Sequence, residues 1–334
     1  MKFSERHLRF DIVFLDLLYA ILKLDKSVLQ TKYQTVKTQY PTEGRRKWRL
    51  RVLYDSWPQF ASESSNINVV QVGSVSQASV RRLSSFPSWK SRLKAFNNQY
   101  ESDPDPSDSV LEDEELGLII RTDFTNDDAW NTFCQKVQAA QKELLSDLSN
   151  GGVEASAAED GGDVSMEDVP PPPPPATADD ADDSDSSSEE AEIVKILDPS
   201  DPADRLRLTN ISNLAALRLF NDVDIRPALT PPAGTKRISP PNPLIDQEGW
   251  QEIYRGKNLW IYDTKSITDE CVRVVGQAGD FYGTASGDSW RARGSHVAEL
   301  QFNMTYQGMK IDFNGLDKWD WNERARNLQE CSVL

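Results

Sequence analysis

The sequence predicts an α/β fold, in which a single domain with a mixed β-sheet is split by a disordered insert rich in acidic residues and proline. The first observation is the segment 117–130, where a buried strand runs directly into the start of a helix. Four small or apolar residues precede Arg121 and Asp123, and Thr125 or Asn126 can cap the helix that follows. The second observation is a helical repeat after this strand, and the third is a series of strand-like segments in the second half of the chain.

Apolar residues recur at helical spacing after the strand, and Gly151 with Gly152 is expected to end that helix. The members of the repeat are Trp130, Phe133, Val137, Leu144, Leu145 and Leu148. Beyond the insert, the pattern predicts strands at 193–197, 258–263, 271–275 and 309–313, and helices at 206–220, 250–254, 297–302 and 319–328. The glycine-rich segment 276–287 lacks a phosphate-loop pattern and is expected to form a mobile loop.

The chain of 334 residues is long enough for one well-packed domain with appendages. Its predicted parts are a basic, partly helical and poorly defined N-terminal region (1–100), an acidic linker (101–112), the first part of the α/β domain (113–150), the insert (151–192), the second part of the domain (193–330) and a terminal tetrapeptide (331–334).

Cysteine and histidine are scarce, which disfavours several classes of site. Cys134, Cys271 and Cys331 are too few and too scattered for a disulfide framework and have no metal-binding spacing. The two histidines, His7 and His296, leave little scope for a zinc site or a Ser-His-Asp triad. We therefore expect no metal site and no cofactor, and the sequence points to no particular reaction.

Charge is distributed unevenly along the chain. Residues 1–100 carry seventeen basic and seven acidic side chains, whereas 151–192 carries fourteen acidic and no basic ones. Without the insert, the net charge of −16 becomes −2. The apolar run 8–24 is interrupted by Asp11 and Asp16, which favours a buried or partner-seeking helix over a membrane span or signal peptide.

A basic cluster at 45–51 interleaves five cations with one tryptophan. Such a cluster contacts phosphates or an anionic membrane in some proteins, but a solvated basic face is the commoner explanation. Recognition of nucleic acid is not expected from this cluster alone. The stretch 56–110 shows little periodicity and is predicted to be mostly loop.

The insert cannot bury enough apolar surface to offset its chain entropy, so it is predicted to be disordered. Its six consecutive prolines, 170–175, favour a polyproline II conformation, which SH3, WW or profilin-type partners recognise, although a plain spacer needs no partner. Ser186 and Ser187 each have a glutamate three residues later, the spacing that acidophilic kinases favour. We expect phosphorylation there to deepen the negative field of the insert.

Ile193, Val194 and Ile196 directly follow the acidic residues of the insert. An acidic run leading into this apolar pattern resembles a SUMO-interacting motif, which binds by adding a strand to the sheet of its partner. The alternative is that the segment re-enters the domain as its second strand, and this is the favoured interpretation.

The tetrapeptide Cys331-Ser332-Val333-Leu334 fits a prenylation box, with leucine favouring a geranylgeranyl group on Cys331. Two features weigh against it: the predicted helix 319–328 leaves few free residues upstream, and those residues are not basic. A single lipid also gives only reversible membrane binding. A membrane association through Cys331 therefore stays open.

The predicted domain resembles an uncharacterised family found in short bacterial proteins and in longer fungal ones. The resemblance rests on Ile-Arg-Thr-Asp-Phe-x-x-Asp-x-x-Trp (120–130), on Asp263-Thr264, and on Trp290-Arg291 through Ser295 to Asn303-Met304, with a looser match at 309–313. It covers residues 113–150 and 192–325. It implies a fold and a set of shared residues, but no activity.

Two acidic residues mark the candidate site. Asp123 and Asp263 each follow a predicted strand, and in open α/β sheets ligands gather beyond the carboxyl ends of strands. The resemblance adds Arg121, Arg291 and Asn303 as candidate ligand-binding residues. The cluster of two carboxylates and two guanidinium groups would bind a polar ligand, or a divalent cation through its acids. Alternatively it is a structural network, in which Asp123 caps the following helix and Arg291 pairs with Asp263.

These observations predict a cytoplasmic or nuclear protein that acts as a non-enzymatic interaction or scaffolding module, with protein partners recruited through residues 151–197. Two alternatives are a ligand-binding or metal-dependent enzyme that uses Asp123 and Asp263, and a prenylated peripheral membrane protein. No catalytic residue is identified.

Overall fold

The computed structural model confirms the predicted fold class. It describes residues 26–64, 103–112, 115–154, 192–229, 234, 242–247, 249–280, 283–311 and 320–333. Five strands form a mixed sheet in the order β2-β1-β5-β6-β7: β1 (Gly117–Arg121), β2 (Val194–Leu197), β5 (Asn258–Tyr262), β6 (Cys271–Val275) and β7 (Ser289–Arg293). β1 pairs in parallel with both β2 and β5, whereas β6 pairs antiparallel with β5 and β7. β3 (Asp222–Pro227) and β4 (Trp250–Arg255) form a separate antiparallel pair.

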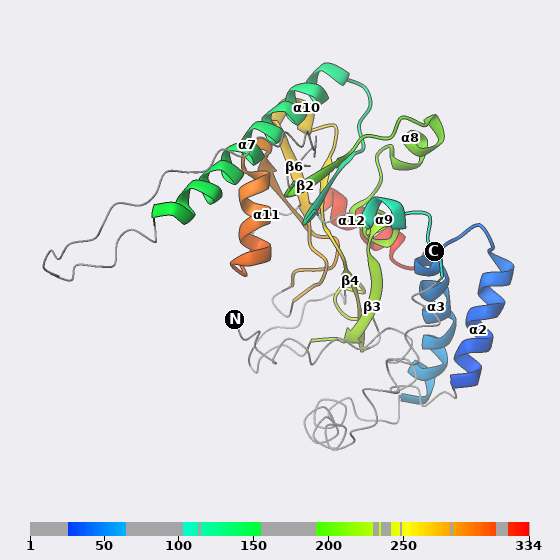
Figure 1. Ribbon diagram of the computed structural model, residues 1–334. Coiled ribbons are helices and arrows are strands. Elements are labelled where there is room, and N and C mark those ends of the chain that lie inside the picture. The colour runs from blue at the N-terminus through cyan, green and yellow to red at the C-terminus, as the bar shows by residue number, and fades with distance from the viewer. Residues whose placement is uncertain are drawn as a thin grey trace, which may run out of the picture.

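Helices cover both faces of the larger sheet (Figure 1). The described helices are α2 (Lys26–Gln39), α3 (Arg45–Ser64), α6 (Asp108–Leu111), α7 (Asp127–Glu154), α8 (Pro202–Leu208), α9 (Asn213–Phe220), α10 (Ser266–Asp269), α11 (Val297–Tyr306) and α12 (Trp321–Glu330), with a 3₁₀ turn, η2 (Gly294–His296). None of the described helices is both long and apolar enough to cross a membrane.

The central strands divide their side chains between two cores, because successive residues of a strand point to opposite faces. Leu118 and Ile120 of β1 belong to a first core that also contains apolar residues of α2, α3, α9 and the β3–β4 pair. Ile119 belongs to a second core, formed with residues of α7 and α11. The α2–α3 pair therefore shares a core with the α/β domain and lies beside the C-terminal end of the described chain (Figure 1).

The opening of the domain follows the sequence prediction closely. β1 is buried along its whole length, and Asn126 caps α7 by accepting a hydrogen bond from the backbone N–H of Ala129. The helix does not end at Gly151 and Gly152, as predicted, but continues to Glu154. Glycine weakens a helix interior by about 1 kcal/mol without forbidding it, so a helix already formed can run through two of them.

Three other predictions in the second half of the domain are wrong. The helix expected at 206–220 is two helices, α8 and α9, which separate where Asn210 adopts a φ of 51° and Ser212 caps the second helix. The helix expected at 250–254 is strand β4, since Trp250 and Tyr254 lie on one face of a strand as readily as on one face of a helix. No strand forms over 309–311, and 312–313 lie outside the described residues.

Two surface predictions are also corrected. The cluster at 45–51 is the beginning of α3 and not a solvated basic face, because Arg46 and Arg49 are only 3% and 5% exposed. Residues 283–287 of the glycine-rich segment, expected to form a mobile loop, are buried. The apolar run 8–24 and almost all of the acidic insert, including Ser186 and Ser187, lie outside the described residues.

Candidate functional site

The candidate site lies where the neighbouring parallel strands β1 and β5 end. The chain leaves β1 through α7 to reach β2 on one side, and it later returns as β5 on the other side. Such a change of direction is the place where open α/β sheets bind ligands. Asp123 follows β1 and Asp263 follows β5, so the structure brings the two predicted carboxylates to one edge of the sheet.

The loops after the two strands are tied together. The backbone N–H and the hydroxyl of Thr122 both donate to the carbonyl oxygen of Tyr262, at 2.9 and 2.8 Å. One step further, the Thr264 hydroxyl donates to Asp123 Oδ2 at 2.6 Å. Asp123 Oδ1 accepts from the backbone N–H and the hydroxyl of Thr125, at 2.8 and 2.5 Å. Asp123 therefore closes the turn that leads into α7, although Asn126 and not Asp123 caps the helix.

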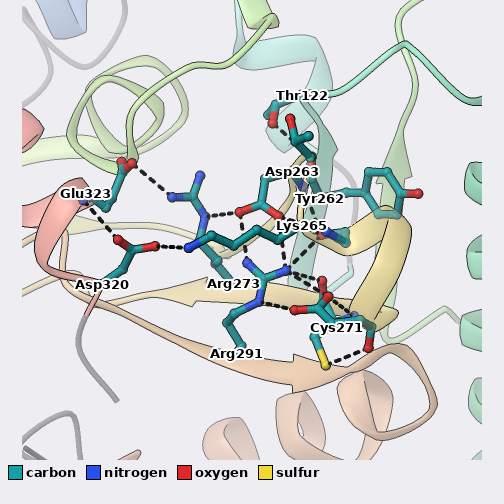
Figure 2. Close-up of polar contacts among 12 residues, drawn as sticks. Thr122, Tyr262, Asp263, Lys265, Cys271, Arg273, Arg291, Asp320 and Glu323 are labelled. Atoms are coloured by element: carbon teal, nitrogen blue, oxygen red, sulfur yellow. Dashed lines mark hydrogen bonds and ion pairs between the residues drawn. The ribbon is translucent and has the colours of Figure 1, made fainter. Parts of the chain in front are cut away.

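Asp263 lies between two arginines that face each other across β6 and β7 (Figure 2). Arg291 forms a bidentate pair with it, with Nη1 at 2.8 Å from Oδ2 and Nη2 at 3.0 Å from Oδ1. Arg273 Nε lies 3.2 Å from the same Oδ2, and Ser266 donates its N–H and its hydroxyl to Oδ1. Like charges directly opposite each other on paired strands repel. The single negative charge of Asp263 lies between them and reduces this repulsion, and the four hydrogen bonds from Arg291 and Ser266 equal the number of lone-pair positions of a carboxylate.

The network continues to the C-terminal helix (Figure 2). Arg273 Nη1 lies 3.0 Å from Glu323 Oε2, and the other oxygen of Glu323 accepts the backbone N–H of Asn213 at 2.6 Å. Asp320 accepts the N–H of Glu323, which caps α12, and pairs with Lys265 at 3.0 Å. These contacts attach α12 to the sheet and to the start of α9.

Arg121 occupies a separate network between the ends of β1 and β2. Its side chain is 2% exposed, and Nη1 lies 3.2 Å from Asp198 Oδ2. Nη2 pairs with Asp127 in the first turn of α7, and Nε donates to the backbone oxygen of Asp123. Trp130 donates its indole N–H to Asp198 at 2.9 Å. The guanidinium therefore joins two loops to a helix start, and its donors are used within the protein.

Both candidate carboxyls are held in the ionised form. Burial opposes ionisation of Asp263, but hydrogen bonds from Arg291 and the charge of Arg273 outweigh it and lower the pKa below the usual value. For Asp123, burial is likewise outweighed by the hydrogen bonds from Thr125 and Thr264, and the pKa is lowered. A general acid needs a raised pKa, so neither group is tuned for that role.

Of the five predicted ligand-binding residues, the structure brings four to this edge of the sheet. Asp123, Asp263 and Arg291 lie in connected contacts, and Arg121 lies beside them. Asn303 does not join them, because Gln301 on the same helix donates to the backbone oxygen of Leu116 at the opposite end of β1. Asn303 therefore stays a separate prediction, outside the cluster of the two acids.

Arg273, Glu323 and Thr264 belong to the network but escape prediction from the sequence. Arg273 had a visible signal, since a cation in the middle of the apolar strand β6 needs an acidic partner. Glu323 had no such signal in the sequence. It contacts Arg273 only because α12, from the C-terminal part of the chain, packs against the sheet. Among the described residues, no three side chains of His, Cys, Asp or Glu are placed to hold a metal ion.

The segment with the SUMO-type pattern is strand β2, so the interpretation of residues 193–197 as the second strand is confirmed. Gln141 on α7 accepts the backbone N–H groups of both Ile193 and Val194 at 2.9 Å. Val194 is 2% exposed, whereas Ile196 is half-buried. A partner that adds this segment to its own sheet would first have to separate it from β1 and from Gln141.

Cys331, the candidate for lipidation, is 6% exposed and packs into the first core. Its backbone oxygen accepts from Arg218 Nη2 at 2.9 Å and from the Tyr54 hydroxyl, and Arg218 Nη1 donates to the oxygen of Val333 at 2.6 Å. Burial raises the pKa of the thiol. A transferase would have to detach this segment from Arg218 to reach Cys331.

Comparisons of the chain with family models, with curated proteins and with solved structures found no match. The resemblance to the uncharacterised domain family therefore stays a prediction, and the geometry of the site carries the functional argument.

Proposed function

We propose that this protein is a non-enzymatic interaction module, in which the α/β domain is a rigid support and the acidic insert recruits protein partners inside the cell. One observation carries this proposal: the carboxylates of Asp123 and Asp263 form hydrogen bonds and ion pairs with other residues of the fold. A carboxylate that serves a reaction or a metal ion needs free lone pairs directed at the ligand. Here hydrogen bonds and ion pairs from within the chain occupy them.

The position of the insert also supports the proposal. It begins at the last turn of α7, whose end projects from the body of the molecule (Figure 1), and it ends at the start of β2. Gln141 fixes that return point through two backbone N–H groups. A recruiting segment between two anchored elements can engage a partner without disturbing the sheet.

A binding experiment with the full chain tests the proposal. Purified SH3, WW and profilin-type proteins would be titrated against the labelled protein, with fluorescence anisotropy as the readout. We expect at least one reader to bind and to lose about tenfold or more in affinity when 170–175 are changed to serine. Changing Pro240 and Pro241 to serine is the matched control and should leave affinity unchanged. If no reader binds, or if binding does not depend on prolines 170–175, recruitment through this tract is contradicted.

A thermal-shift experiment tests the enzymatic alternative separately. The wild type and Asp263→Asn would be melted with and without Mg²⁺, Mn²⁺ or Ca²⁺ at millimolar concentration. If the carboxylates are structural, the cations shift both proteins equally. A cation that stabilises the wild type but not the variant would favour a metal-dependent site over the proposal.

A further inference from the structure

The segment expected to be an acidic linker lies against the first turn of α3 like a bound peptide. Asp103 accepts hydrogen bonds from the Tyr33 hydroxyl and from Lys37 Nζ, at 2.9 and 2.6 Å. The backbone N–H of Arg45 donates to the oxygen of Pro104 at 3.4 Å. The segment 103–112, here named the acidic strap, is therefore recognised through its backbone as well as its side chains.

Two further carboxylates of the strap complete the contact. The backbone N–H of Arg46 donates to Asp105 Oδ2 at 3.2 Å, and its Nη1 lies 2.5 Å from Asp105 Oδ1. Asp108 pairs with Arg45 at 2.6 Å and with Arg46 at 3.0 Å. Anions are stabilised at a helix N-terminus, where backbone N–H groups lack partners within the helix. A β-carbon on Gly44 would lie 2.7 Å from the Asp105 α-carbon, so the close approach depends on glycine at this position.

The strap and the helices that hold it are anchored by different forces. The α2–α3 pair packs into the first core through buried side chains that include Leu50, Leu53 and Trp57. The strap adds Val110 and Leu111 to that core, both partly buried, and is otherwise held mainly by ion pairs, with a few hydrogen bonds beside them. Loss of the strap would therefore leave the helices in place and expose three cations, Lys37, Arg45 and Arg46.

The strap does not close the site completely. A cavity of about 510 Å³ opens beside it, between the start of α3, the start of β3 and the turn from β4 to β5. Arg45 and Arg46 line this cavity together with Arg255 and Lys257, and three carboxylates, Asp108, Glu112 and Asp222, line it as well. The Nε of Arg46 is buried and lies 3.4 Å from Asp222 Oδ1, a contact that is an ion pair but not a hydrogen bond. Arg45 and Arg46 therefore border open space while the strap is in place.

We propose that the groove formed by Tyr33, Lys37 and the first turn of α3 is a docking site for acidic peptides of the form Asp-Pro-Asp, and that the strap occupies it as an intramolecular ligand. This site is distinct from the insert, and the proposal stands even if the insert recruits nothing. When a partner peptide binds, the ion pairs between the strap and the groove are lost, and the acidic residues of the peptide form equivalent ion pairs with the same cations. It competes only against the high effective concentration of the tethered strap.

A competition experiment with the full chain tests this proposal. The probe is a fluorescein-labelled synthetic peptide with the sequence of residues 101–112. The double variant Asp103→Asn, Asp105→Asn weakens the strap and should bind the probe about tenfold or more tighter than the wild type does. Adding Arg46→Gln should abolish binding, whereas adding Lys136→Gln on α7 should leave it unchanged. A probe with both aspartates changed to asparagine should not bind, and 0.5 M NaCl should weaken the interaction.

The proposal is overturned if the wild type and the folded double variant bind the probe with equal affinity. It is also overturned if adding Arg46→Gln leaves the affinity unchanged. Hydrogen exchange of the wild type gives a second test that needs no variant. Raising NaCl from 50 mM to 0.5 M should accelerate exchange in 103–112 but not in residues 50–57 of α3, because only the strap is held mainly by charge. Exchange that responds to salt in both segments together, or in neither, also overturns the proposal.

Discussion

Replacing Asp263 by asparagine removes the one carboxylate, among the residues that the structure describes, that contacts both Arg273 and Arg291. The two guanidinium groups are directly opposite each other on β6 and β7, and the side chain of Arg273 is only 6% exposed. Removing one partner of a buried ion pair costs about 3–5 kcal/mol, because the remaining charge is left buried without compensation. Glu323 and Asp269 still contact the two arginines, which places Asp263→Asn near the lower end, at about 3 kcal/mol.

Chemical and thermal unfolding of the full chain would measure this loss. For a domain of this size, about 3 kcal/mol corresponds to a fall in melting temperature of roughly 6–12 °C. Asp269→Asn is the matched control, since its side chain is 39% exposed and Arg291 keeps its bidentate contact with Asp263. We expect that control to lose about 1 kcal/mol or less. A melting temperature of Asp263→Asn equal to or above that of the wild type would refute the structural role of this network.

The same network predicts a pH dependence. The pKa of Asp263 is lowered in the folded state, since Arg291 and Arg273 outweigh the effect of burial. Its contribution to stability is therefore present above the unfolded pKa of about 4, and it is lost as the pH falls through the folded value. The difference in unfolding free energy between wild type and Asp263→Asn should be constant from pH 6 to 8 and shrink below about pH 4. A difference that stays constant down to pH 2 would contradict this assignment.

Three further substitutions follow from single contacts. Gln141→Ala leaves two backbone N–H groups at the start of β2 without acceptors, so the unfolding free energy should fall by about 2 kcal/mol in chemical denaturation. The control is Gln138→Ala, at an exposed position on the same helix, which should lose about 0.5 kcal/mol or less. Tyr262→Phe removes a buried hydroxyl that has no hydrogen-bond partner in the described structure, so unfolding free energy should stay equal or rise by up to about 1 kcal/mol; a clear decrease would reveal a partner. Arg218→Met releases the carbonyl oxygens it holds near the C-terminus and should accelerate maleimide labelling of Cys331 about tenfold or more, in a background without the other two cysteines. Labelling at the wild-type rate would show that Arg218 does not hold this segment.

The part of the candidate site that sequence could predict is the part encoded locally. A buried strand, an acid just past its end and a helix cap all lie within a dozen residues, so 117–130 predicts β1, Asp123 and the start of α7 together. Pairing of Asp263 with Arg291 was foreseen as the structural alternative, and the bidentate contact agrees with it. The second arginine on Asp263 was not foreseen, because Arg273 reaches it through the register of β6 against β7.

Ambiguous local patterns were settled by partners distant in the chain. Trp250 and Tyr254 fit a helix or a strand equally well, and pairing with β3 across a proline-rich segment selects the strand. The basic cluster at 45–51 reads as a solvated face until the acidic strap and Asp222 are placed against it. In both cases the information lies in a contact between segments, and no window of sequence contains it.

The sequence by itself determined the fold class and the existence of most elements, because hydrophobic periodicity and capping residues act over one or two turns of chain. It also established the uneven charge, and with it the acidic insert as the candidate recruiting segment. Only the tertiary structure decided how the acids are used. Whether Asp263 is a free ligand or a structural counter-ion depends on which cations lie within about 3 Å, a distance set by strand register and helix packing over long stretches of chain.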